Sequence, residues 1–182
     1  MKQTTIEPYS SIYKKLQTII PNLEEHIGQG KESGRSQLHS PGMMDLHFDY
    51  LRTDEQGRHI IALGHYFKQN GDSVPDPDME IRIMPEMKMA EAMTFQDQRI
   101  YQQVYQYEGD KELVNTHLKK DMNYFLNQWL TNAIAQGHRI DLSKGENEQE
   151  IDNSPNSHAA RADELVDIRH KNNEVPEKGI ER

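Results

Sequence analysis

Three polar side chains alternate with apolar ones in one short segment, and their types could hold a divalent metal ion. Asp45, His47 and Asp49 stand two residues apart, which in a β-strand places them on one face with about 7 Å between neighbours. Carboxylates and imidazoles are ordinary metal ligands. The apolar residues between Met44 and Tyr50 account for a buried opposite face, and any half-buried antiparallel strand shows this alternation. We favour a solvent-exposed face and keep the metal site as an alternative.

A second group of carboxylates lies within residues 72–80. Asp76 and Asp78 are at its centre, and their oxygens could bind Ca²⁺ or Mg²⁺. Pro77 stands between them, and the segment lacks the central glycine and the twelfth-position glutamate of an EF-hand loop. Asp and Pro are also common turn formers. The sequence therefore favours a turn over residues 73–78, with Asp76 and Asp78 as alternative metal ligands.

A nuclease-like pattern of two carboxylates and a lysine begins at Pro77. Asp78, Glu86 and Lys88 match the string Pro-Asp followed by Glu-x-Lys, in which the carboxylates hold Mg²⁺ and the lysine assists a water molecule. If residues 79–84 form one strand at ~3.3 Å per residue, the two carboxylates lie near its opposite ends. They cannot share a metal ion unless the chain folds back, and we disfavour this site.

One histidine and three tyrosines have structural interpretations that we prefer to chemical ones. His65 follows Gly64 in an apolar alternation that points it inward, and a buried, hydrogen-bonded histidine is expected there in place of a catalytic base. Tyr101, Tyr105 and Tyr107 could stack nucleobases, but basic residues do not accompany them. Sheet packing is the favoured interpretation. The chain also has no cysteine and therefore no thiolate chemistry.

The first element expected along the chain is an amphipathic helix over residues 9–20. Its apolar residues recur at intervals of three and four. Ser10 and Ser11 are the predicted N-caps, and Pro21 is the predicted stop, followed by one more turn to about His26. Residues 28–42 are rich in glycine and serine, and this composition predicts a loop.

The middle of the chain predicts antiparallel strands. Residues 44–50 and 59–68 form a hairpin, residues 79–84 are a third strand that Pro85 ends, and residues 88–95 and 100–107 are two more. Asn115 is then the expected N-cap of a long helix that Gly137 ends. Trp129 lies in the centre of its apolar stripe and is expected to anchor the core. The predicted fold class is α+β, an antiparallel sheet of about five strands with an N-terminal and a C-terminal helix packed on one face.

Composition divides the chain into a folded part and a tail. Residues 1–142 contain the aromatic residues and most aliphatic ones, and they are predicted to form a single α+β domain. Residues 143–182 are acidic and poor in apolar residues, which predicts a mostly disordered tail with a candidate short helix near 159–170. No apolar run approaches the ~18 residues of a membrane span, and no signal peptide is recognised. We expect a cytoplasmic protein.

Several segments resemble known families. Residues 79–83, residues 90–92 and the string Asn-Tyr-Phe-Leu-Asn-Gln-Trp-Leu at residues 123–130 resemble a YqiB-type bacterial domain of unknown function. Residues 64–79 are similar to uncharacterised proteins encoded on bacterial conjugative and other mobile elements. These resemblances imply the order of strands and helices. They provide no catalytic motif to carry over.

The net charge of −9 disfavours nucleic acid as a partner, because phosphate contact depends on clustered lysine and arginine. The expected function is a non-enzymatic accessory or protein-interaction module whose partner is another protein, and the sequence does not determine the oligomeric state. We assign no catalytic residue and no cofactor. The alternative is a metal-dependent hydrolase or nuclease that uses the Asp/His cluster, and the two are distinguished by whether those side chains converge.

Overall fold

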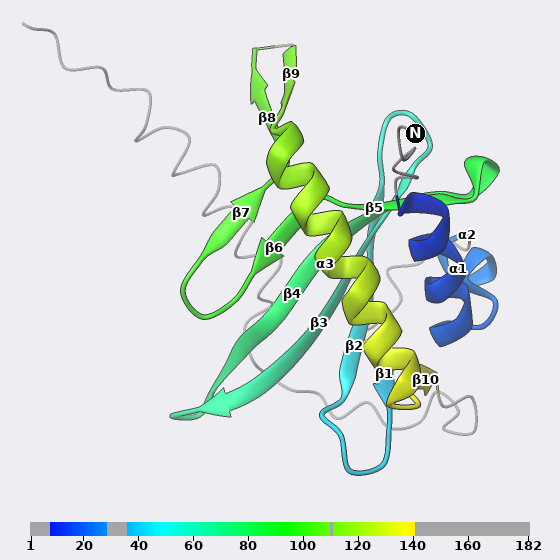
Figure 1. Cartoon of the computed structure of the whole chain (residues 1–182), viewed down its shortest axis with the longest axis vertical. Coiled ribbons are helices and arrows are strands. Elements are labelled where there is room, and N and C mark those ends of the chain that lie inside the picture. Colours follow the sequence, from blue (N-terminus) through cyan, green and yellow to red (C-terminus); the bar gives the residue numbers. More distant parts are fainter. Residues whose placement is uncertain (1–7, 29–35, 110, 141–182) are drawn as a thin grey trace, which may run out of the picture. The chain divides into compact units, whose positions relative to one another are not determined.

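The computed structural model describes residues 8–28, 36–109 and 111–140. Helix α1 (Tyr9–Ile19) confirms the first predicted helix and buries Ile12, Leu16 and Ile19 (Figure 1). The serine caps are wrong, because the helix begins before them: Pro8 is the N-cap, and its carbonyl accepts from the Ile12 N–H at 2.8 Å. The helix ends ahead of Pro21, as predicted, and α2 (Leu23–Gly28) adds the short second turn.

The predicted loop over residues 28–42 contains a strand, so that prediction is wrong for residues 36–39. Strand β1 (Ser36–His39) pairs antiparallel with both β2 (Leu46–Thr53) and β10 (Arg139–Ile140). Its anchor is Leu38, which is fully buried. Pairing with distant strands and the burial of one leucine outweigh the local turn composition of the segment.

The centre of the sheet is an antiparallel meander of β2, β3 (His59–Gln69) and β4 (Asp72–Met84). The predicted hairpin is confirmed. Asn70 and Gly71 form the turn between β3 and β4, with φ of 54° and 92°. The predicted loop over residues 73–78 is wrong, because these residues extend β4 along β3. A register shift between Gly64 and Tyr66 accompanies the proline-containing segment. Among the described strands, β5 and β6 pair with β4 only from Asp78 onward, so this segment is a local edge of the sheet, where prolines are tolerated.

Each of the next two predicted strands divides into two. A 3₁₀ turn (η1, Pro85–Met87) ends β4, as Pro85 predicted. Strands β5 (Met89–Ala92) and β6 (Thr94–Gln96) then pair with β4, and β7 (Tyr101–Gln103) pairs with β6. Strands β8 (Tyr105–Glu108) and β9 (Lys111–Val114) form a separate two-stranded hairpin. The divisions fall at Met93 and Val104, where the Val104 N–H donates to the Met93 carbonyl at 2.9 Å.

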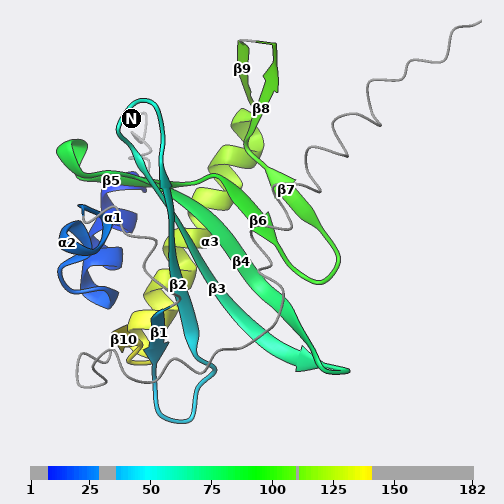
Figure 2. The same ribbon diagram turned by 180° about the vertical axis from the view of Figure 1, so that it is seen from behind.

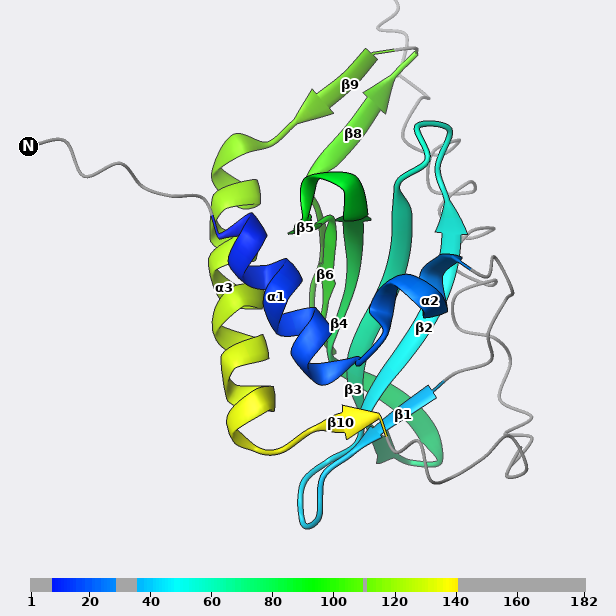
Figure 3. The ribbon, with the colours of Figure 1, turned by 90° about the vertical axis from the view of Figure 1, so that its right-hand side faces the viewer.

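Helix α3 (Thr116–Ala135) lies beside α1 across one face of the sheet (Figure 3). We call this face of the sheet the inner face. The opposite, outer face is seen from behind (Figure 2). Asn115 is the N-cap, as predicted, and its side chain accepts from the Leu118 N–H at 3.1 Å. Leu126 and Leu130 are fully buried apolar positions of the helix. Trp129 is only partly buried and packs at the margin of the core, so its predicted central place is wrong.

These elements confirm the α+β class, with an antiparallel sheet and an N-terminal and a C-terminal helix on its inner face. Within the described ranges the main sheet has eight strands, in the order β10-β1-β2-β3-β4-β6-β7 with β5 also on β4, so the expected number of about five was too small. The predicted tail of residues 143–182, including its candidate helix, lies outside the described residues. In the described part of the chain, no helix is both long and apolar enough to cross a membrane.

Candidate functional site

The first predicted metal ligands lie on and beside β2. Leu46, Phe48 and Tyr50 are buried on the inner face, which confirms the alternation within the strand. Met44, also expected on the buried face, is exposed. His47 and Asp49 therefore lie on the outer face, opposite Gly64 and Ala62 of β3. Asp45 precedes the strand, and its Oδ1 lies 2.8 Å from Nδ1 of His39.

Asp76 and Asp78, the remaining metal candidates, lie within β4. Asp78 is nearly buried and pairs in register with Gly64 and Gln96. Glu86 lies in η1, beyond the other end of β4, so the nuclease-like pair does not come together. Among the described residues, no three His, Asp or Glu side chains are grouped so that they could hold a metal ion.

His65 is partly buried and hydrogen-bonded, as expected. Its Nδ1 lies 3.0 Å from the Asp45 carbonyl oxygen, and its ring packs against Trp129 and His138 with centroids 5.6 and 5.5 Å away. Burial lowers the pKa of His65, the hydrogen bond to Asp45 opposes this, and the nearby charge of His138 lowers it further. The net effect is a lowered pKa, which favours the neutral imidazole.

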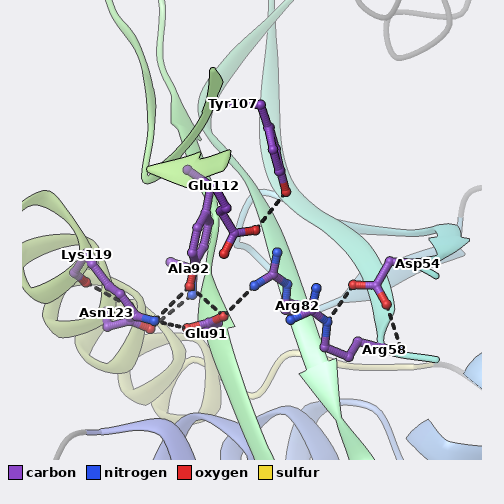
Figure 4. A network of polar contacts seen from close by, with 10 residues as sticks. Asp54, Arg58, Arg82, Glu91, Ala92, Tyr107, Glu112, Lys119 and Asn123 are labelled. Atoms are coloured by element: carbon purple, nitrogen blue, oxygen red, sulfur yellow. Dashed lines mark hydrogen bonds and ion pairs between the residues drawn. The ribbon is translucent and has the colours of Figure 1, made fainter. Parts of the chain in front are cut away.

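A buried ionic cluster, which the sequence interpretation missed, surrounds Glu91 of β5 (Figure 4). Oε1 of Glu91 accepts from Nη1 of Arg82 at 3.0 Å and from the Tyr105 hydroxyl at 2.8 Å. Oε2 lies 2.7 Å from Nζ of Lys119 on α3. We call Arg82, Glu91, Tyr105 and Lys119 the Glu91 cluster. It joins strands β4, β5 and β8 to the first turns of α3.

Further contacts within the Glu91 cluster fix the ring of Tyr105. Nζ of Lys119 donates to the Tyr105 hydroxyl at 2.7 Å, and the Arg82 guanidinium lies 4.5 Å from the centroid of that ring. Both Arg82 and Glu91 are almost fully buried, with exposed fractions of 3% and 5%. Two cations surround one carboxylate, so the cluster carries a net positive charge.

Asn123 of α3 extends the contacts of the Glu91 cluster to the backbone of β5. Its Oδ1 accepts from the Ala92 N–H at 3.0 Å, and its Nδ2 donates to the Lys119 carbonyl oxygen at 2.7 Å. Asn123 is fully buried, and both polar atoms of its side chain are hydrogen-bonded to the backbone.

The contacts of the Glu91 cluster shift the pKa values of Lys119 and Tyr105. Burial alone would lower the pKa of Lys119, but the hydrogen bonds to Glu91 and Tyr105 outweigh it and raise the pKa above its usual range. Burial raises the pKa of Tyr105, and the hydrogen bond from Lys119 opposes this only in part. Neither group is poised to exchange a proton near neutral pH, as a general acid or base would be. The contacts of the cluster hold β4, β5, β8 and α3 together.

The Glu91 cluster fixes the base of the β8–β9 hairpin, which extends beyond the end of α3 and away from the main sheet (Figures 1 and 3). The hairpin exposes three large apolar side chains. Tyr107, Leu113 and Val114 have exposed fractions of 56%, 45% and 41%. Tyr107 also donates its hydroxyl to Oε2 of Glu112, its cross-strand partner, at 2.8 Å.

A hollow lies at the foot of β9. Its volume is about 410 Å³, and it is lined by Tyr9, Val114, Thr116, Lys119 and Lys120. Two of these residues are cationic, and none is acidic. The hollow therefore joins the apolar surface of β9 to a positively charged wall.

Other aromatic side chains lie on the flank of α3. Phe125 packs edge-on against Phe95 of β6, with centroids 5.4 Å apart, and stacks on Trp129 at 6.2 Å. Tyr124, next to Phe125, is exposed. Sheet packing was expected for three other tyrosines. Tyr105 is buried, whereas Tyr101 and Tyr107 are exposed, so that interpretation holds for Tyr105 alone.

The chain belongs to the family described as a domain of unknown function (DUF6908), which it matches over residues 14–139. The match begins within α1, ends at the first residue of β10, and includes all of α3 and every residue of the Glu91 cluster. The family match supports the expectation of an uncharacterised domain. It does not support the resemblance to a YqiB-type domain or to proteins of mobile elements. No curated protein and no solved structure shows a significant match to the chain.

Proposed function

We propose that this domain is a non-catalytic module that binds a partner protein through the β8–β9 hairpin. One observation carries the proposal: the hairpin exposes Tyr107, Leu113 and Val114 while its base is fixed by the buried Glu91 cluster. Tyrosine and apolar side chains are typical of the centres of protein interfaces, where they contribute most of the binding energy.

The fixed base also orders the hairpin in the free protein, and this order supports binding. An isolated two-stranded hairpin is marginally stable in water, and ordering a mobile segment on binding costs free energy. Tyr105, the first residue of β8, is buried and bonded to Glu91 and Lys119. The hairpin is therefore ordered before a partner arrives, which favours its use as a recognition element.

The described residues give no observation that favours the metal-dependent alternative. The accessory role in a bacterial cell or mobile element is part of the same proposal, and it rests on the resemblance of residues 64–79 and 123–130. The expected compartment, the cytoplasm, is likewise proposed.

The experiment is quantitative capture of host proteins by three forms of the full chain. The parent is compared with Tyr107→Ser/Leu113→Ser, which removes one tyrosine and one aliphatic side chain from the hairpin. The matched control is Tyr124→Ser/Ile100→Ser, which removes the same two kinds of exposed side chain from α3 and from the β6–β7 turn. Thermal melting of each form verifies that the fold is kept.

The proposal expects a set of partners that the parent and the control capture and that the hairpin variant loses. Equal capture by all three forms contradicts it. Loss of the captured partners in the control alone also contradicts the proposal, and it assigns binding to the flank of α3. Failure of the parent to capture any protein above background counts against the interaction role itself.

A further inference from the structure

The outer edge of β9 has backbone groups that point away from β8. The Asn115 N–H donates to the Val104 carbonyl oxygen at 2.9 Å, toward β8. The Val114 carbonyl belongs to the same peptide group as that N–H, and it therefore points the opposite way. In an antiparallel ladder the backbone N–H and C=O groups of successive residues point alternately toward and away from the partner strand. The N–H and C=O groups of Glu112 and Val114 therefore face outward, away from β8. In the described part of the chain, no strand other than β8 pairs with β9.

Apolar side chains flank this edge on both faces of the hairpin. Leu113 and Val114 are consecutive, and they therefore point to opposite faces. Both are exposed. An added strand would bury these side chains and would satisfy the outward backbone groups. It would also convert a two-stranded hairpin into a three-stranded sheet, which is the more stable arrangement.

The charge of the hollow at the foot of β9 selects the kind of residue that such a strand would carry there. Lys119 already contacts Glu91. Lys120, by contrast, is exposed and has no acidic partner among the described residues. The hollow thus has one cation whose charge is not offset, in a chain whose net charge is −9. An acidic side chain or a terminal carboxylate is complementary to it.

We propose that the partner provides an extended segment that pairs with the outer edge of β9 and places an acidic group against Lys120 in the hollow. This mode of binding is strand addition, in which the backbone gives affinity and the pockets give specificity. It deepens the proposed function and rests on it. The Glu91 cluster holds both halves of the site, since Tyr105 begins β8 and Lys119 lines the hollow.

The test is an NMR titration of the ¹⁵N-labelled full chain with a blocked peptide of alternating threonine and valine that ends in two glutamates. We expect the amides of Glu112, Val114 and Lys120 to shift together. A peptide with two lysines in place of the glutamates should bind about three- to fivefold more weakly, as expected for loss of one exposed ion pair. In Lys120→Glu the preference should reverse in favour of the lysine peptide.

The backbone contribution is tested by Val114→Pro, with Val114→Ala as its control. Proline removes the outward N–H, and it removes no ladder bond to β8, because that N–H does not face β8. We expect the proline variant to lose the peptide-induced shifts and the alanine variant to keep them. Lys120→Glu tests the site separately if the proline variant fails to fold.

Three results overturn this inference. They are unchanged shifts in Val114→Pro, equal binding of the glutamate and lysine peptides, and no shifts at a peptide concentration of about 1 mM, where even weak strand addition is detectable. The capture experiment distinguishes a failure of this inference from a failure of the proposed function. If they are lost in Tyr107→Ser/Leu113→Ser but kept in Lys120→Glu and Val114→Pro, the hairpin binds a partner by another mode.

Discussion

Arg82 and Glu91 stand directly opposite each other on β4 and β5, and Nη1 of the guanidinium lies 3.0 Å from Oε1 of the carboxylate. Both side chains are nearly buried. Burying charges is costly unless each is paired and hydrogen-bonded. Glu91 meets that condition through three donors on three different elements, so its removal leaves two cations without their counter-ion.

We therefore predict that Glu91→Gln destabilises the domain strongly. Breaking a buried ion pair by removing one partner costs about 3–5 kcal/mol, and the free energy of unfolding, measured by urea denaturation, should fall by that amount. Glu80→Gln is the control, because Glu80 meets Arg52 at 3.4 Å in a pair whose side chains remain 27% and 53% exposed. Its loss should cost no more than about 1 kcal/mol. Similar losses in the two variants would show that the Glu91 cluster is not a stabilising contact.

Asn123→Leu tests the contact between α3 and β5. The change keeps the size of the side chain but leaves the buried Ala92 N–H without an acceptor, which costs about 1–3 kcal/mol. Asn132→Leu on the exposed side of α3 should change the free energy of unfolding by less than about 0.5 kcal/mol. The prediction is wrong if both substitutions have the same effect in urea denaturation.

Local patterns in the sequence were sufficient for much of the fold. The helix over residues 9–20, the hairpin of β2 and β3, and the cap at Asn115 follow from periodicity and turn chemistry, and the structure confirms them. The errors arise where pairing between strands that are distant in sequence determines the local structure. β1 forms because Leu38 is buried between two strands, and residues 73–78 are extended because β3 provides a partner for β4.

The Glu91 cluster could not be predicted because its members are distant in sequence. Arg82 and Glu91 face each other only because η1 turns the chain back, and Tyr105 and Lys119 join them from β8 and α3. One signal was present: an arginine and a glutamate each lie between apolar residues in short strand-like segments. Charged residues on both sides of a tight turn are candidates for a cross-strand pair.

The lowered pKa of His65 predicts a pH dependence of stability. Because the folded state binds the proton less readily than the unfolded chain, this contribution is complete above the ordinary value of about 6.5 and is lost as the pH falls below it. His138, Asp45 and Asp76 are the charged or titratable groups near the ring. The free energy of unfolding should fall from pH 7 to pH 5 more steeply in the parent than in His65→Gln.

The measurement is urea denaturation at several pH values, with the exposed His39→Gln as the control. The slope in the parent should exceed that in His65→Gln by up to about 1.4 kcal/mol per pH unit. The control should keep most of the parent's slope. A parent and a His65→Gln variant with parallel pH profiles would show that His65 protonates equally in the folded and unfolded states.

The central claim, that the β8–β9 hairpin contacts a partner protein, is tested most directly by photo-crosslinking in the cell of origin. A photoreactive phenylalanine analogue replaces Leu113 on the hairpin in one form and Tyr124 on α3 in another, since both positions are exposed. We predict a discrete protein adduct from position 113, weakened by Lys120→Glu, and none from position 124. Adducts from position 124 alone, or no adduct from position 113, would contradict the account.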